Sequence, residues 1–251
     1  MVSDWLKSKK KPPGPDDSGI DKTAYSTEML PDYVPPFPDE LVHFFERAKA
    51  AGIHEASLRS QYLLRLEDAV RWTQSVRGHP IVDALSGLVL DDVETSNHHF
   101  YVGAGPLKGS VFFLCHDGDS RIVYASLTEF LAAAIRARDV EQLVEEQHPT
   151  RSPVAGDQVG LSAWMRHLLT LEERGELVPP FVPSLDLSDS SLLRDLASDE
   201  DFFIVQSVAL EICARPSQRL IEIAQLCARH GHPQASRDGS RAVAAIQAPQ
   251  V

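Results

Sequence analysis

The sequence predicts an α+β protein, in which a small antiparallel or mixed sheet with flanking helices is followed by a helical C-terminal segment. Apolar residues recur at helical spacing before residue 80 and after residue 126. Between these positions the spacing changes to two or to continuous apolar runs. Such runs are typical of strands, and strands that follow one another without a crossover helix pair as antiparallel neighbours. The helices on either side are then expected to flank the sheet.

Residues 1–37 are expected to form a flexible basic arm, because lysine and proline dominate them and proline cannot donate a backbone hydrogen bond. Pro38 suits the first turn of a helix, and Gly52 is placed to end it. The apolar residues between them have helical spacing: Leu41, Phe44, Phe45 and Ala48. A second helix is predicted over residues 55–76 by the same criterion, with Gly78 ahead of Pro80 as its stop.

Four apolar segments in the middle of the chain are predicted to be strands: GLVLDDVE, HHFYVG, SVFFLC and RIVYAS. The glycines of GAGPLKGS mark the turn between the second and third strands. Asp117 and Gly118 predict a tight type I′ turn before the fourth strand, since this pair tolerates positive φ. Ser126 and Glu129 form an S-x-x-E capping box, which predicts a helix directly after the last strand.

A boundary is predicted at residues 148–157, where Pro149, Pro153 and Gly156 interrupt any helix. It separates an α+β domain over residues 38–147 from a helical region over residues 148–251. Helical spacing returns at residues 161–169, and prolines break it again near residue 180. Asp201, Pro216 and Gly231 then delimit two further helices, a pattern similar to a HEAT-type hairpin.

The composition excludes several functional classes. The formal net charge is -12, which argues against a nucleic-acid-binding surface, because such surfaces need Lys and Arg to neutralise phosphates. No apolar run approaches the ~18 residues of a membrane span, and no apolar segment follows the basic start as in a secretory leader. The three cysteines form no C-x-x-C pair. We therefore expect a cytoplasmic protein without a membrane partner.

The best candidates for metal or acid–base chemistry are the histidines and aspartates of the predicted strands and turn: His98, His99, His116, Asp117 and Asp119. Adjacent His98 and His99 point to opposite faces of a regular strand, and the aspartates have a sufficient role in the turn. GAGPLKGS is no phosphate loop, because a strand follows it instead of a helix. We expect no catalytic, cofactor-binding or metal-binding residues. A metal-dependent hydrolase that uses His98, His116 and Asp117 remains the alternative.

One stretch, residues 98–135, also combines a G-x-V strand, a His-Asp turn, a further apolar strand and a Ser-Leu helix start that continues into E-F-L. The residues concerned are Gly109, Val111, His116, Asp117, Ile122, Val123, Ser126, Leu127, Glu129, Phe130 and Leu131. In these features the chain resembles the SMI1/KNR4 (SUKH) family. A looser likeness extends over residues 30–140, and the family pattern does not cover residues 150–251.

The resemblance implies an α+β scaffold that binds another protein and catalyses nothing. Bacterial members of the family neutralise a toxin by binding it, and fungal relatives act in cell-wall signalling. We therefore expect a binding module, of which an immunity protein against a basic toxin is one form. Loop position and charge suggest the acidic residues that contact this partner: Asp91, Asp92, Glu94, Asp117 and Asp119. A helical-repeat scaffold, in which residues 186–247 bind the partner, is the other alternative.

Overall fold

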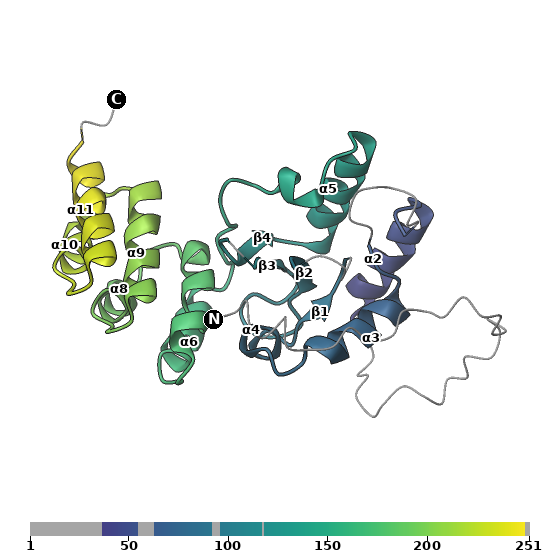
Figure 1. Cartoon of the computed structure of the whole chain (residues 1–251), viewed down its shortest axis with the longest axis horizontal. Helices are drawn as coiled ribbons and strands as arrows, with labels where there is room; N and C mark the ends of the chain where they lie inside the picture. The colour runs from purple at the N-terminus through teal and green to yellow at the C-terminus, as the bar shows by residue number, and fades with distance from the viewer. Residues whose placement is uncertain (1–36, 55–62, 92–95, 117, 249–251) are drawn as a thin grey trace.

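The computed structural model describes residues 37–54, 63–91, 96–116 and 118–248. Over these residues the chain is α+β, and four strands form one antiparallel sheet in the order β1-β2-β3-β4 (Figure 1). The strands are β1 Leu88–Val89, β2 His98–Tyr101, β3 Val111–Leu114 and β4 Arg121–Tyr124. The predicted fold class and the antiparallel neighbours are confirmed.

The first helix, α2 Asp39–Ala50, agrees with the prediction. It buries the four apolar residues that predicted it, and Gly52 follows with a left-handed φ of 69°. Glycine adopts this conformation without the Cβ clash that other residues suffer, so it is a suitable stop.

The sequence predicts one helix over residues 55–76, but the observed helix α3 spans only Leu66–Val76. The prediction is therefore wrong for residues 63–65, which are not helical. Residues 55–62 lie outside the described residues. Leu63 forms an isolated antiparallel bridge with Asp91, and Leu64 N donates to Leu90 O at 2.9 Å. These backbone bonds to the segment after β1 replace helical ones. A short helix, α4 Pro80–Ala84, then precedes the sheet.

The two central turns differ from each other in how well the sequence predicted them. Gly105 and Gly109 have φ values of 76° and 89°, so the glycine turn between β2 and β3 is confirmed. The prediction of a two-residue type I′ turn between β3 and β4 is wrong, because β3 ends at Leu114 and β4 begins only at Arg121. Cys115 N donates to Ser120 Oγ at 3.0 Å, which closes this longer loop. Asp117 lies outside the described residues.

The helix α5 Leu127–Asp139 follows the last strand and begins with the predicted capping box. Ser126 Oγ accepts from Glu129 N at 3.3 Å, and the Glu129 carboxylate accepts from Ala125 N at 3.0 Å. Two donors at the helix start are thereby satisfied.

Helices cover both faces of the sheet. On one face Phe130 of α5 packs against Tyr124 and against Phe44 of α2, with ring centroids 5.7 Å and 6.0 Å apart. On the other face Phe112 of β3 packs against Phe181 of the 3₁₀ helix η3 Pro179–Ser184, at 5.6 Å. The C-terminal region therefore completes the core of the sheet instead of standing apart from it.

After η2 Val144–Gln147, which lies against α5, the remaining helices form the C-terminal part of the molecule, seen in green to yellow in Figure 1. They are α6 Gln158–Leu168, α7 Arg174–Leu177, α8 Ser190–Ala197, α9 Phe202–Ala214, η4 Gln218–Leu220, α10 Ile221–Ala228 and α11 Pro233–Gln247. Residues 148–157 contain no helix or strand, as predicted. Gly239 of α11 lies against α10 so closely that a Cβ would meet Ala228 N at 2.2 Å.

Candidate functional site

Three segments that are distant in sequence meet at the end of the sheet where β2 begins, β3 ends and β4 begins. Asn97 Nδ2 donates to the carboxylate of Glu145 at 3.2 Å, and Asn97 Oδ1 accepts from His116 N at 2.9 Å. Arg121 Nη2 donates to Pro149 O at 2.5 Å. The described residues of segments 96–97, 115–121 and 144–149 are therefore tied together into one surface, which we call the loop end.

A buried chain of three side chains lies beneath the loop end. The carboxylate of Asp91 accepts from His99 N at 2.9 Å through Oδ1, and its Oδ2 lies 2.5 Å from His99 Nδ1. His99 Nε2 in turn lies 2.7 Å from His148 Nε2. The side chains of Asp91 and His99 are both 0% exposed, whereas His148 is partly exposed. We call these three residues the histidine relay.

The geometry fixes how protons can be arranged in the relay. A carboxylate only accepts, so Nδ1 of His99 carries a proton toward Asp91. A hydrogen bond between two Nε2 atoms needs one donor and one acceptor, so a single proton lies between His99 and His148. A second proton there would place two N–H groups against each other and break the contact.

The surroundings of His148 favour its neutral form. Its ring packs against Phe113 of β3 and Tyr124 of β4, with centroids 4.6 Å and 5.8 Å away. Burial, together with repulsion by His99 and Arg121, lowers the pKa of His148 to about 3. The hydroxyl of Tyr124 donates to Gln147 O at 3.1 Å, and burial raises the pKa of Tyr124 to about 12. The relay thus joins the segment after η2 to the sheet.

The acidic residues that were predicted to contact a partner differ in their exposure to solvent. Asp91 is wrong as a partner contact, because its side chain is fully buried and is occupied by His99. Asp119 is exposed at the loop end, as a contact residue must be. Asp92, Glu94 and Asp117 lie outside the described residues.

The structure places the two adjacent histidines of β2 on opposite faces of the sheet, as the sequence predicts for a regular strand. His98 is buried beside Phe100, whereas His99 points to the opposite face and packs against Phe130 of α5 with centroids 4.8 Å apart. His116 is half-buried at the loop end. Within residues 37–54, 63–91, 96–116 and 118–248 no group of three or more His, Cys, Asp and Glu side chains could hold a metal ion.

The sequence reasoning missed the relay. One signal was present in the sequence, because an aspartate, Asp91, directly follows the apolar LVL segment. Since β1 pairs with β2 in antiparallel orientation, extending this register places Asp91 beside His98 and His99. A charged residue at a strand position that should be buried predicts a buried partner. No local signal identifies His148, which lies 49 residues beyond His99 in the chain.

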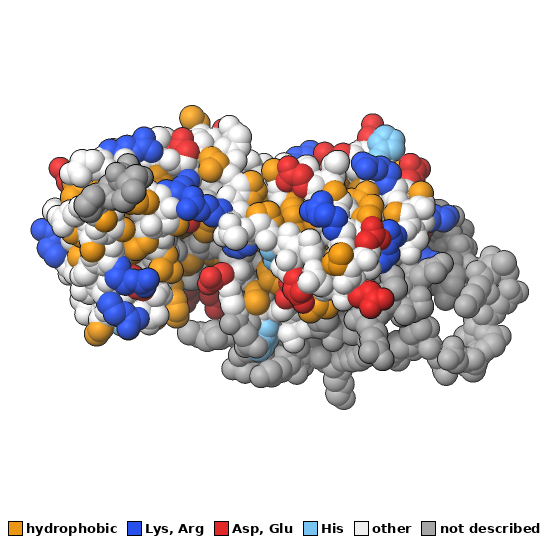
Figure 2. Space-filling model, turned by 90° about the horizontal axis from the view of Figure 1, so that it is seen from above, with side chains coloured by type: hydrophobic (Ala, Val, Ile, Leu, Met, Phe, Trp, Pro, Cys, Tyr) orange, Lys and Arg blue, Asp and Glu red, His pale blue; other side chains and the backbone are white. Residues whose placement is uncertain are grey.

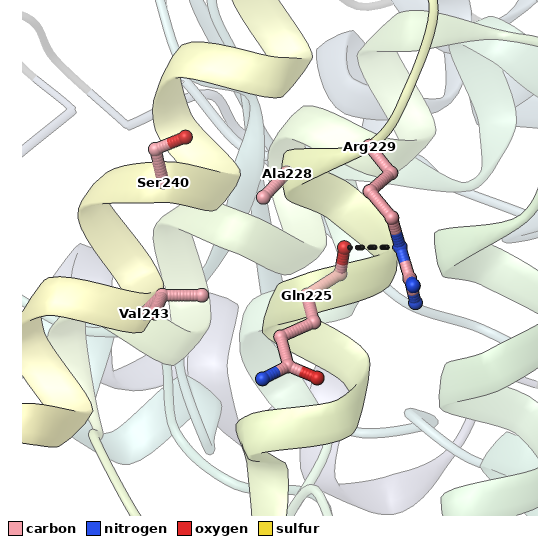
Figure 3. Close-up of a pocket in the computed structure, with 5 residues that line it drawn as sticks. All are labelled: Gln225, Ala228, Arg229, Ser240 and Val243. Carbon is pink, nitrogen blue, oxygen red and sulfur yellow. Dashed lines mark hydrogen bonds between the residues drawn. The ribbon is translucent and has the colours of Figure 1, made fainter.

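A hollow of about 380 Å³ lies between α10 and α11 (Figure 3). These two helices lie at the C-terminal end of the molecule, away from the sheet (Figure 1). Gln225, Ala228, Arg229, Ser240 and Val243 line the hollow. Arg229 Nε donates to Gln225 O at 3.2 Å, and Ser240 Oγ donates to Ser236 O at 2.9 Å. Two of the three polar side chains that line the hollow, Arg229 and Ser240, are therefore bonded to their own helices.

Comparisons of the chain with family models, with curated proteins and with solved structures found no match. The resemblance to the SMI1/KNR4 family stays a prediction. No helix within the described residues combines the length and the apolar character that crossing a membrane requires.

Proposed function

We propose that this chain is a non-enzymatic protein-binding module that contacts a basic partner protein through the loop end. The observation that carries the proposal is the set of hydrogen bonds that Asn97 and Arg121 make, which tie three segments into one surface. Asp119 and Glu146 are exposed on it. A surface of this kind, like the resemblance to the SMI1/KNR4 family, supports recognition of a protein.

Two physical effects favour such a surface in binding. Loops that are already fixed lose less conformational entropy when a partner docks, so more of the interaction energy appears as affinity. Exposed carboxylates attract a basic partner over a distance and raise the association rate. The same charges repel phosphates, which argues against nucleic acid as the ligand.

A toxin that acts on nucleic acid fits this description, since its own ligand-binding surface must be basic. An acidic module that covers that surface would neutralise the toxin by occlusion. This is the role of an immunity protein, and it requires no chemistry from the module.

The histidine relay supports a structural role better than a catalytic one. A general base works best when its pKa lies near the working pH, whereas the pKa of His148 is lowered to about 3. His99 and Asp91 are fully buried and bonded to each other, so neither can contact a substrate. The relay instead holds the segment of His148 against the sheet and thereby helps to fix the loop end.

The proposal can be tested by photo-crosslinking in cells that produce the chain. Benzoylphenylalanine would be placed at Asp119 and at Glu146, with Arg194 on the exposed side of α8 as the matched control position. The proposal expects one basic protein to crosslink from both loop-end positions and not from the control. Crosslinking from Arg194 alone would favour the helical-scaffold alternative, and no crosslink from the loop end would refute the proposal.

A further inference from the structure

Two large apolar side chains are exposed where α5 ends and η2 begins, next to the loop end. Val140 is 58% exposed and Leu143 is 41% exposed, while their neighbour Val144 is buried at 1%. Figure 2, which looks down on the α5 side of the molecule, shows hydrophobic side chains lying among charged ones on this face. Two exposed apolar residues this close together need an explanation that a single one does not.

The backbone between these two residues keeps them on the outside. Glu141 has a left-handed φ of 55°, a conformation that costs a residue other than glycine about 1 kcal/mol. It turns the chain from α5 into η2, so that Val144 faces the core and Val140 and Leu143 face solvent. The turn is a helix C-cap, because Glu141 N donates to Arg138 O at 3.1 Å and Gln142 N donates to Ala137 O at 2.9 Å.

The charge around the apolar pair is mainly negative, and the exposed Arg136, one turn before Val140, is the exception on α5. Residues 139–146 contain four acidic residues and neither lysine nor arginine: Asp139, Glu141, Glu145 and Glu146. The preceding Arg138 is already engaged, since its guanidinium pairs with Asp139 at 2.7 Å and also donates to Ala51 O. Because Asp139 pairs with Arg138 and Glu145 accepts from Asn97, the carboxylates that an approaching cation can reach most directly are the exposed Glu141 and Glu146.

We propose that Val140 and Leu143 are the apolar anchors for a cationic amphipathic segment of the partner, with its Lys or Arg side chains against the acidic residues. This inference rests on the proposed function and specifies the kind of partner. Small apolar anchors inside a charged rim are the usual arrangement of a protein interface, because desolvated apolar contacts supply affinity and the rim supplies specificity. A mainly acidic rim favours a basic segment over an acidic one.

The test uses the full chain and a defined probe, an 18-residue peptide of Lys and Leu whose leucines recur at i, i+3, i+4 and i+7 so as to form an amphipathic helix. Its affinity would be measured by fluorescence anisotropy for the wild type and for V140S/L143S. The matched control is V154S/V159S, because Val154 and Val159 are 50% and 84% exposed on another surface. We expect V140S/L143S to weaken binding about tenfold, as the loss of two partly buried anchors should. The control should bind like the wild type.

A second peptide with Glu in place of Lys tests the role of charge. The inference is overturned if the Glu peptide binds as tightly as the Lys peptide, if the wild type binds neither, or if both variants retain the affinity of the wild type. These results leave the crosslinking test at Asp119 and Glu146 unaffected, so failure of the inference can be told apart from failure of the proposed function. Thermal unfolding of each variant would confirm that the fold is intact.

Discussion

Replacing His148 by glutamine should remove a specific part of the acid sensitivity of the fold. Glutamine can donate to His99 through its Nε2–H or accept from it through Oε1, so it can keep the hydrogen bond, but it does not titrate. In the wild type the pKa of His148 is about 3 in the folded chain and 6.5 when unfolded. The unfolded chain therefore binds the proton first as the pH falls, so the stability contributed by neutral His148 is present above pH 6.5 and is lost below it.

The magnitude follows from these two values. Between pH 7 and pH 5.5, protonation of the unfolded imidazole lowers the free energy of unfolding of the wild type by about 1.3 kcal/mol more than that of H148Q. This figure changes little so long as the folded pKa stays below about 4.5, so it depends on burial of the neutral ring and not on the exact value.

Urea denaturation followed by tryptophan fluorescence would measure the effect at both pH values, at low protein concentration because the sequence pI is about 5.2. Titrating groups that do not contact His148 contribute equally to both proteins and cancel in the comparison. Parallel pH dependence of the wild type and H148Q would refute the assignment of His148 as a buried neutral histidine.

Three further substitutions test the packing around the site. Asp91→Asn removes the buried charge from the relay and should lower the free energy of unfolding by about 3 kcal/mol, whereas exposed Asp119→Asn should change it by less than about 0.5 kcal/mol. Gly239→Ala should destabilise α10 against α11 by about 2 kcal/mol, measured as a lower urea midpoint, while Gly156→Ala, which has open space, should be neutral. Phe181→Ala should cost about 3–5 kcal/mol and expose residues 148–157 to limited proteolysis, because η3 covers one face of the sheet. Equal effects in a variant and its control, or unchanged proteolysis for the last, would contradict these assignments.

Much of the fold follows from local patterns. In both α2 and α5 the buried apolar residues recur at helical spacing. Gly52 follows the end of α2 and Ser126 caps the start of α5, so local and tertiary preferences agree. Leu63 and Leu64 show where this fails. Their apolar spacing fits a helix, but backbone bonds to Leu90 and Asp91, which are distant in sequence, hold them extended. A local pattern cannot show such a partner.

The site was predicted less well for the same reason. Loop position correctly places Asp119 at the surface, but it also suggested that Asp91 is exposed. Charged residues are rarely buried without a partner, so the burial of Asp91 depends on His99. The register between β1 and β2 was needed to see this pair. His148 joins it only through the tertiary fold.

The salt dependence of partner binding tests the central claim most directly. The protein captured by crosslinking would be purified, and its Kd for the wild type and for D119N/E146Q would be measured over a range of NaCl concentrations. The account predicts that affinity of the wild type falls as salt rises, and that the slope is smaller for the variant, since two exposed carboxylates are lost. An affinity that does not change with salt, or equal slopes for the two proteins, would contradict the role of the loop end.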